Sequence, residues 1–163
     1  MPLALEAGAI DGAIFDPGLA SQLTAKGFSM VADLSRFNIP ASGIGPVVTS
    51  AYLRRSPEIA DKVLTALVES LAFTLSSRNK LTVLKTVMKH LRITDQAAAE
   101  ESYQELLIFN RKPYPSVKGM RNVQRLLALQ NPKVGSVKIE EIVESRFVRK
   151  LDDSGFIDRL YMK

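Results

Sequence analysis

The residues with the clearest chemical potential are Phe15-Asp16-Pro17-Gly18, where an apolar run gives way to a helix start. Asp16 can cap a helix with its carboxylate, and Pro17 suits the first helical position because its φ is already helical. The free backbone N–H groups of such a helix start carry a partial positive charge and point outward, so they suit an anion. Gly18 would let a ligand approach the backbone closely. A plainer interpretation stays open: Asp16 only caps the helix and Phe15 only fills the core.

The other patterns of catalytic and metal chemistry are missing from the sequence. It has no cysteine, which excludes thiol chemistry and zinc–thiolate sites. His90 is the only histidine and has no acidic or cysteine partner at ligand spacing, whereas a metal site needs several converging ligands. A P-loop, a dinucleotide fingerprint and a nucleophile elbow are also missing. We therefore expect a protein that is not an enzyme and holds no metal or cofactor.

The elements around the Phe15–Gly18 turn predict part of a parallel sheet. Residues 9–15 and 28–32 are short apolar runs typical of strands, and a helix from Asp16 to Lys26 separates them. This strand–helix–strand order favours a parallel pair. Residues 47–49 form a third short strand candidate, after a crossover or hinge rich in glycine and proline. So few strands indicate that the sheet is missing other members.

The chain after residue 50 changes to helical periodicity. Ser56-Pro57-Glu58 is a strong helix start, and apolar residues at a spacing of three or four predict a helix to about residue 75. Further helices are expected over residues 81–91, 94–107, 116–127 and 139–151. Thr94 is expected to cap the helix over 94–107, and Ser116 the helix over 116–127. The expected fold class is therefore α/β and mostly helical, with about three short strands and about six helices.

Length, composition and charge narrow the class of protein. The 163 residues are 46% hydrophobic, which suits a single globular core rather than a disordered chain. The net charge of +5 is scattered along the sequence, whereas a nucleic-acid interface needs a basic stripe with interleaved aromatic residues. No uncharged stretch is apolar enough for a membrane span. The first residues also lack the basic region of a signal peptide.

Several motifs together resemble the nitrate, sulfonate and taurine type of solute-binding protein, the extracytoplasmic receptors of ABC importers. They occur in the family's order over nearly the whole chain, at residues 5–17, 25–28, 47–53, 56–59 and 151–158. The first reads LEAGAIDGAIFDP, a helix end, a strand and an aromatic–acid–proline turn. Each motif alone is weak, and their order and spacing carry the resemblance.

The resemblance implies the C-terminal half of a type II periplasmic-binding-protein fold, in which a ligand lies between two α/β lobes. Residues 1–36 would be the remnant of the second lobe, 37–50 the return crossover and 51–163 the helical part of the first lobe. Phe15, Asp16, Pro17 and Gly18 would line the cleft. The hinge would comprise Ser42, Gly43, Gly45 and Pro46, although an ordinary surface loop explains these residues equally well.

The resemblance also implies the partners. The full-length parent would bind a small anionic or zwitterionic solute outside the cytoplasm and present it to an ABC permease. Because a carboxylate repels a plain anion, Asp16 would better suit a ligand that also carries an amine. The missing N-terminal half leads us to expect an internal start, a cloning artefact or a truncated gene, and association of copies through an exposed sheet edge.

Two other functions are also compatible with the sequence. The chain could be a helical protein–protein interaction module that binds no small molecule. It could also be a relative of the enzymes that make the thiamine pyrimidine, but those use a cysteine-rich run, and this chain has no cysteine.

Overall fold

The described part of the structure, a computed structural model, is helical. It covers residues 1–15, 17–37, 39–42 and 44–162. Helices account for 64% of the chain, and the described residues contain no strand. The expected α/β class with about three short strands is therefore wrong.

The three strand predictions fail for one physical reason. A helix closes its hydrogen bonds within its own segment, whereas a strand needs a second strand beside it. In the described part of the chain, residues 29–32 and 44–48 make no backbone hydrogen bond. Residues 9–15 contribute one, from the Ala9 N–H to the Ala4 carbonyl at 2.8 Å. These apolar segments therefore have no neighbouring strand to form a sheet with.

The N-terminal segment contains two short helices and a 3₁₀ turn. These are α1 (Pro2–Glu6), α2 (Pro17–Ala25) and a 3₁₀ helix (Leu34–Phe37). The prediction that a helix from Asp16-Pro17 ends near Lys26 agrees with α2, although Asp16 itself lies outside the described residues. Gly27 follows with φ of 95°, a left-handed conformation that glycine adopts without steric cost.

The middle of the chain forms four helices, α3 (Ser50–Arg55), α4 (Pro57–Leu75), α5 (Lys80–Leu91) and α6 (Gln96–Leu106). The predicted helices over 56–75 and 81–91 are confirmed. Helix α3 was not predicted: Thr49, assigned to a strand, instead caps it by accepting a hydrogen bond from the Tyr52 N–H at 3.1 Å. The cap of α6 is Asp95 and not Thr94, since its carboxylate accepts from the Ala98 N–H at 2.7 Å.

The C-terminal part contains α7 (Val117–Ala128), α8 (Ile139–Ile142), α9 (Arg146–Asp153) and α10 (Phe156–Leu160), with a 3₁₀ helix (Pro132–Ser136) after α7. Ser116 caps α7 as predicted, accepting from the Gly119 N–H at 3.0 Å. The single helix predicted over 139–151 is wrong. It breaks after Ile142, because Val143 is extended with ψ of 116°.

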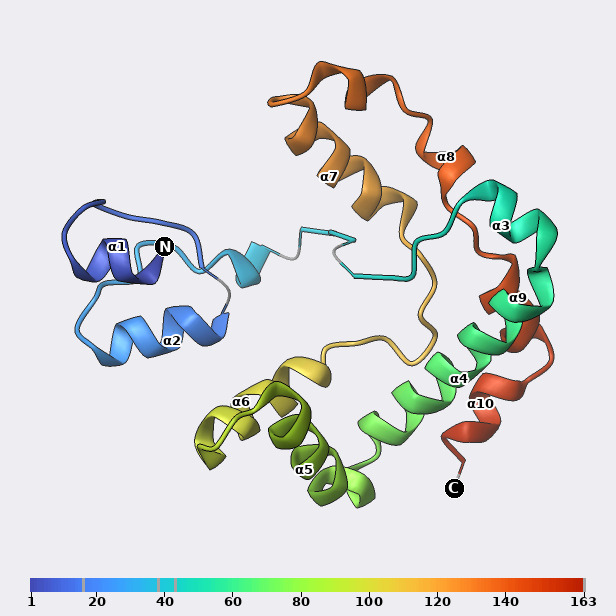
Figure 1. Cartoon of the computed structure of the whole chain (residues 1–163), viewed down its shortest axis with the longest axis horizontal. Helices are drawn as coiled ribbons and strands as arrows, with labels where there is room; N and C mark the ends of the chain where they lie inside the picture. The colour runs from blue at the N-terminus through green and yellow to red at the C-terminus, as the bar shows by residue number, and fades with distance from the viewer. Residues whose placement is uncertain (16, 38, 43, 163) are drawn as a thin grey trace.

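The main buried cluster joins α4 to the C-terminal helices. Val68 of α4 packs with Val148, Leu151 and Ile157, and Val68 and Ile157 are fully enclosed. Phe156, Leu160 and Tyr161 cover this cluster from outside. Burial of these side chains holds α4, α9 and α10 together. The three helices lie side by side in Figure 1.

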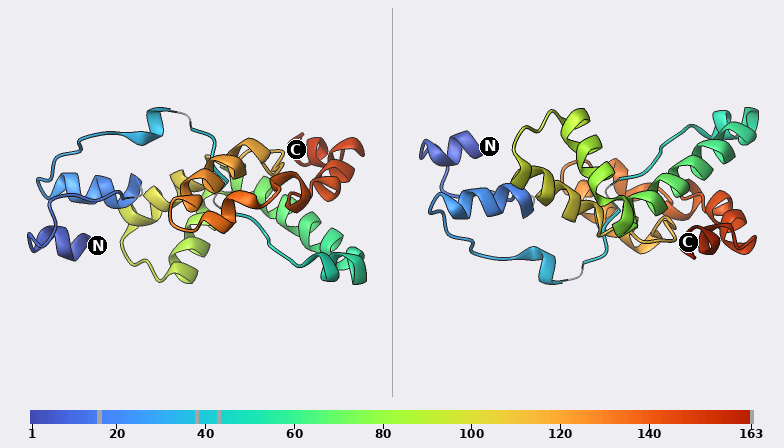
Figure 2. Two further views of the ribbon diagram at one scale, coloured as in Figure 1. Left: turned by 90° about the horizontal axis from the view of Figure 1, so that it is seen from above. Right: turned by 90° about the horizontal axis from the view of Figure 1, so that it is seen from below.

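The rest of the chain is open (Figures 1 and 2). The N-terminal segment with α1 and α2 projects from the other helices and is joined to them through the extended chain before α3. The accessible surface is 12450 Å², whereas a compact protein of 18.0 kDa exposes about 8,000 Å². Among the described helices, none has the length and apolar character that crossing a bilayer requires.

Candidate functional site

The predicted ligand-binding turn lies at the start of α2. Phe15 is half-buried before the helix, Pro17 is its first residue and Gly18 its second, while Asp16 lies outside the described residues. The two best-formed hollows in the described part of the protein are both lined by other residues. The role of Phe15–Gly18 in ligand binding therefore stays a prediction.

The predicted hinge residues differ in how firmly they are held. The Ser42 hydroxyl donates to the Ser116 carbonyl at 3.3 Å, at the start of α7. Gly45 and Pro46 are exposed, and Gly43 lies outside the described residues. Their role as a hinge stays a prediction too.

The larger hollow is an open groove of about 440 Å³ between the start of α4 and α9. Asp61 and Lys150 join its two walls through an ion pair of 2.7 Å between Oδ2 and Nζ. The other carboxylate oxygen of Asp61 has no hydrogen-bond partner in the described part of the protein. The remaining lining residues are Pro57, Glu58, Arg146 and Phe147. Both signs of charge line this open groove, so it does not define one ligand class.

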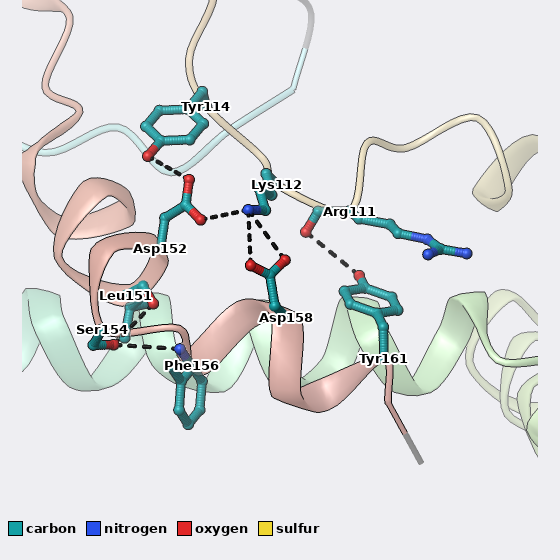
Figure 3. A network of polar contacts seen from close by, with 9 residues as sticks. All are labelled: Arg111, Lys112, Tyr114, Leu151, Asp152, Ser154, Phe156, Asp158 and Tyr161. Carbon is teal, nitrogen blue, oxygen red and sulfur yellow. Dashed lines mark hydrogen bonds and ion pairs between the residues drawn. The ribbon is translucent and has the colours of Figure 1, made fainter.

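The most connected polar cluster joins the loop after α6 to α9 and α10 (Figure 3). The Lys112 ammonium lies 2.7 Å from Asp152 Oδ1 and 3.1 Å from Asp158 Oδ1. The Tyr114 hydroxyl donates to Asp152 Oδ2 at 2.9 Å. Nearby, the Tyr161 hydroxyl donates to the Arg111 carbonyl at 3.4 Å, and the Arg111 guanidinium lies 4.9 Å from the Tyr161 ring centre.

The electrostatics of this cluster suit a structural clamp. Hydrogen bonds to Asp152 and then Asp158 raise the pKa of Lys112, so its amine stays protonated and is no nucleophile or base. Lys112 and Tyr114 lower the pKa of Asp152, which keeps its carboxylate ionised. Partial loss of water, with the Asp152 hydrogen bond second, raises the pKa of the Tyr114 phenol. The cluster therefore ties the loop to α9 and α10 without an activated group.

An apolar stripe on α4 is the other prominent surface feature. Ile59, Val63 and Leu67 recur every four residues, and each is 45–47% exposed. Side chains at this spacing share one helix face. The face is half-covered by the rest of the chain, so it remains free to pack against another surface.

Sequence reasoning missed the Lys112 cluster and the α4 stripe for different reasons. Lys112 and Asp152 are far apart in the sequence, and no local pattern pairs them. The α4 periodicity was visible, but it predicts only an apolar helix face and not what covers that face. Among the described residues, no group of three or more histidine, cysteine, aspartate or glutamate side chains is placed to hold a metal ion.

The geometry therefore offers an open groove, a polar clamp and an apolar helix face. Comparison with protein-family models, with curated proteins and with solved structures found no match for this chain.

Proposed function

We propose that the chain is one part of an extracytoplasmic solute receptor of an ABC importer and binds solute only with the rest of that receptor. The solute class is a small anionic or zwitterionic compound, such as a sulfonate or nitrate. The loaded receptor would then be read by the importer's permease. In this proposal the chain binds and does not catalyse.

The observation that carries the proposal is the amount of uncovered surface. The chain exposes 12450 Å², about 4,400 Å² more than a compact protein of its mass. Permanent complexes bury about 2,000–5,000 Å² or more counted over both partners, so an excess of this size on one chain is enough for an extensive permanent interface. A partner that covers this surface would complete the protein, in agreement with the order of the receptor-like motifs in the sequence.

Three of the most exposed large apolar side chains of the described residues lie shortly before or within the predicted crossover over residues 37–50. Val31 is 98% exposed, Ile44 88% and Val47 92%. Their neighbouring backbone groups are also free, since residues 29–32 and 44–48 make no backbone hydrogen bond in the described part of the chain. Apolar side chains next to free backbone donors and acceptors suit pairing with another polypeptide.

The direct test assembles the receptor and measures solute binding. The chain is co-purified with the polypeptide encoded immediately upstream of it, and taurine and nitrate are titrated into the complex and into the chain alone by calorimetry. We expect binding of at least one of these compounds to the complex and none to the chain alone. A complex that forms but binds neither compound would contradict the proposal.

A pair of variants then tests the predicted ligand turn. Asp16→Ala should weaken the binding of taurine, whose amine the carboxylate could contact, by about tenfold or more, the effect of losing a hydrogen bond to a charged group. Asp11→Ala, which removes a nearby exposed carboxylate, is the matched control and should bind as the parent does. If Asp16→Ala lowers only the melting temperature, Asp16 is a helix cap and not a ligand contact.

A second candidate function is a helical protein–protein interaction module, and the α4 stripe favours it. Ile59, Val63 and Leu67 would pack against an apolar surface of the partner. The same calorimetry separates the two functions. A module would form its complex without binding solute, and Val63→Asp would dissociate it.

A further inference from the structure

We infer that Gly119 and Asn122 of α7 are positioning residues that clasp residues 40–42 and so attach the N-terminal segment to α7. The observation is a close contact between parts of the chain that lie about eighty residues apart in sequence. This inference concerns the conformation of the chain itself and does not depend on any solute.

Two hydrogen bonds hold the clasped segment. The Asn122 side-chain amide donates to the Pro40 carbonyl at 2.9 Å. The Ser42 hydroxyl donates to the Ser116 carbonyl at 3.3 Å, beside the cap of α7. The bonds lie on either side of Ala41, so they fix the direction of the segment as well as its position.

Gly119 provides the space for this contact. It is buried, and a Cβ placed on it would lie 2.9 Å from the Ala41 carbonyl carbon and 3.0 Å from the Ser42 nitrogen. Contacts this short with backbone atoms cannot be relieved by turning a side chain, so any larger residue would push the segment away. Gly119 and Asn122 lie three positions apart and therefore share one face of α7.

The clasp attaches the end of the N-terminal segment to α7 and not to α3. In sequence the segment leads into α3, but residues 44–48 make no backbone hydrogen bond in the described part of the chain. The next fixed point is Thr49, which caps α3. The clasp therefore holds residues 40–42, the end of the N-terminal segment, against α7, whereas residues 44–48, which lead to α3 and α4, have no such backbone contact in the described part of the chain.

The test measures the distance between the N-terminal segment and α7. Because the chain has no cysteine, spin labels can be placed on Ile39→Cys, directly before the clasped residues, and on Leu129→Cys at the end of α7, both exposed positions. The labelled full chain is diluted with unlabelled chain so that only distances within one molecule are recorded by pulsed electron paramagnetic resonance.

Gly119→Ala should strongly broaden the distribution of distances between the two spin labels. Asn122→Ala should enlarge the population outside the main peak of that distribution about fivefold, the effect expected from losing one hydrogen bond. Gly135→Ala is the matched control, because a Cβ there would make only an ordinary 3.6 Å contact with the Ala128 side chain. Alanine favours helices over glycine, so broadening by Gly119→Ala cannot be ascribed to a weaker α7.

The outcomes are distinct. Broadening by Gly119→Ala and Asn122→Ala, with the Gly135→Ala distribution unchanged and circular dichroism showing intact helices, supports the clasp. An unchanged distribution in Gly119→Ala, or equal broadening in Gly135→Ala, would overturn it. Asn122→Ala leaves the helix backbone and all glycines in place, so it still tests the clasp if Gly119→Ala fails to fold: an unchanged distribution in Asn122→Ala would then overturn it.

Discussion

Truncation of Ile157 should be the most damaging single change in the buried cluster. Ile157 is 0% exposed and packs with Val68, Val148 and Leu151 where α4 meets α9 and α10. Ile157→Ala removes three carbon atoms, each worth about 0.8 kcal/mol of burial, and leaves a cavity that adds to the cost. Together these effects predict a loss of about 3 kcal/mol in the free energy of unfolding.

This loss is large because the buried core is small. Only eleven apolar residues of the described part are buried, and the chain hides about half of the ~26,000 Å² that it exposes when unfolded, against about 70% for a compact domain of this size. Ordinary domains have a stability of about 5–15 kcal/mol. Ile157→Ala should therefore remove much of the stability of the α4–α9–α10 unit.

Urea denaturation followed by circular dichroism measures this loss. The matched control is Ile108→Ala, because Ile108 is 80% exposed and its truncation should change the free energy of unfolding by less than about 0.5 kcal/mol. If Ile157→Ala proves no more destabilising than Ile108→Ala, then α9 and α10 do not pack on α4 in solution and the assigned core is wrong.

Three further predictions follow from the polar clamp and the open surface. Lys112→Met should lose less stability on acidification than Lys133→Met, which changes an exposed lysine and serves as the control. Lys112 lowers the pKa of Asp152 in the folded state, so the ionised Asp152 stabilises the fold above its unfolded pKa of about 3.9. This contribution disappears as the pH falls through the lowered pKa of the folded state, and Lys112→Met removes it at every pH. Parallel melting curves from pH 5 to pH 2 would show that the ion pairs do not stabilise the fold. Thermolysin should cut the chain first near Val31 or Val47, because both residues are exposed and lie in segments without backbone hydrogen bonds in the described part of the chain. First cuts within α9 or α10 would contradict the described packing. Size-exclusion chromatography with light scattering should detect association of copies as the protein concentration rises, because the uncovered apolar surface favours association. The sheet edge that was expected to mediate this association does not exist in the described residues. A monomer at every concentration would refute the prediction.

The helices were the predictable part of this protein because the signals that define them are local. Ser116 caps α7 three residues ahead of its bonded N–H, and Pro57 begins the long helix α4. The apolar repeat along α4 likewise predicted an amphipathic helix, since a helix repeats its faces every three to four residues. In each case the interacting groups lie within one or two turns of each other.

Predictions that needed distant partners were the ones that failed or remained open. The apolar run over residues 28–32 has the composition of a strand, but composition cannot supply a neighbouring strand, and without one the segment stays unpaired. The break at Val143 likewise interrupts a periodicity that looks continuous in the sequence.

The sequence by itself determined the helical segments, the absence of cysteine chemistry and the motif order that supports a receptor function. Tertiary structure alone decided that Lys112 pairs with Asp152 and Asp158, that Gly119 lies against Ala41, and that the apolar segments remain uncovered. The physical reason is that local backbone and side-chain preferences act over a few residues, whereas these contacts depend on how far-separated segments approach each other in space.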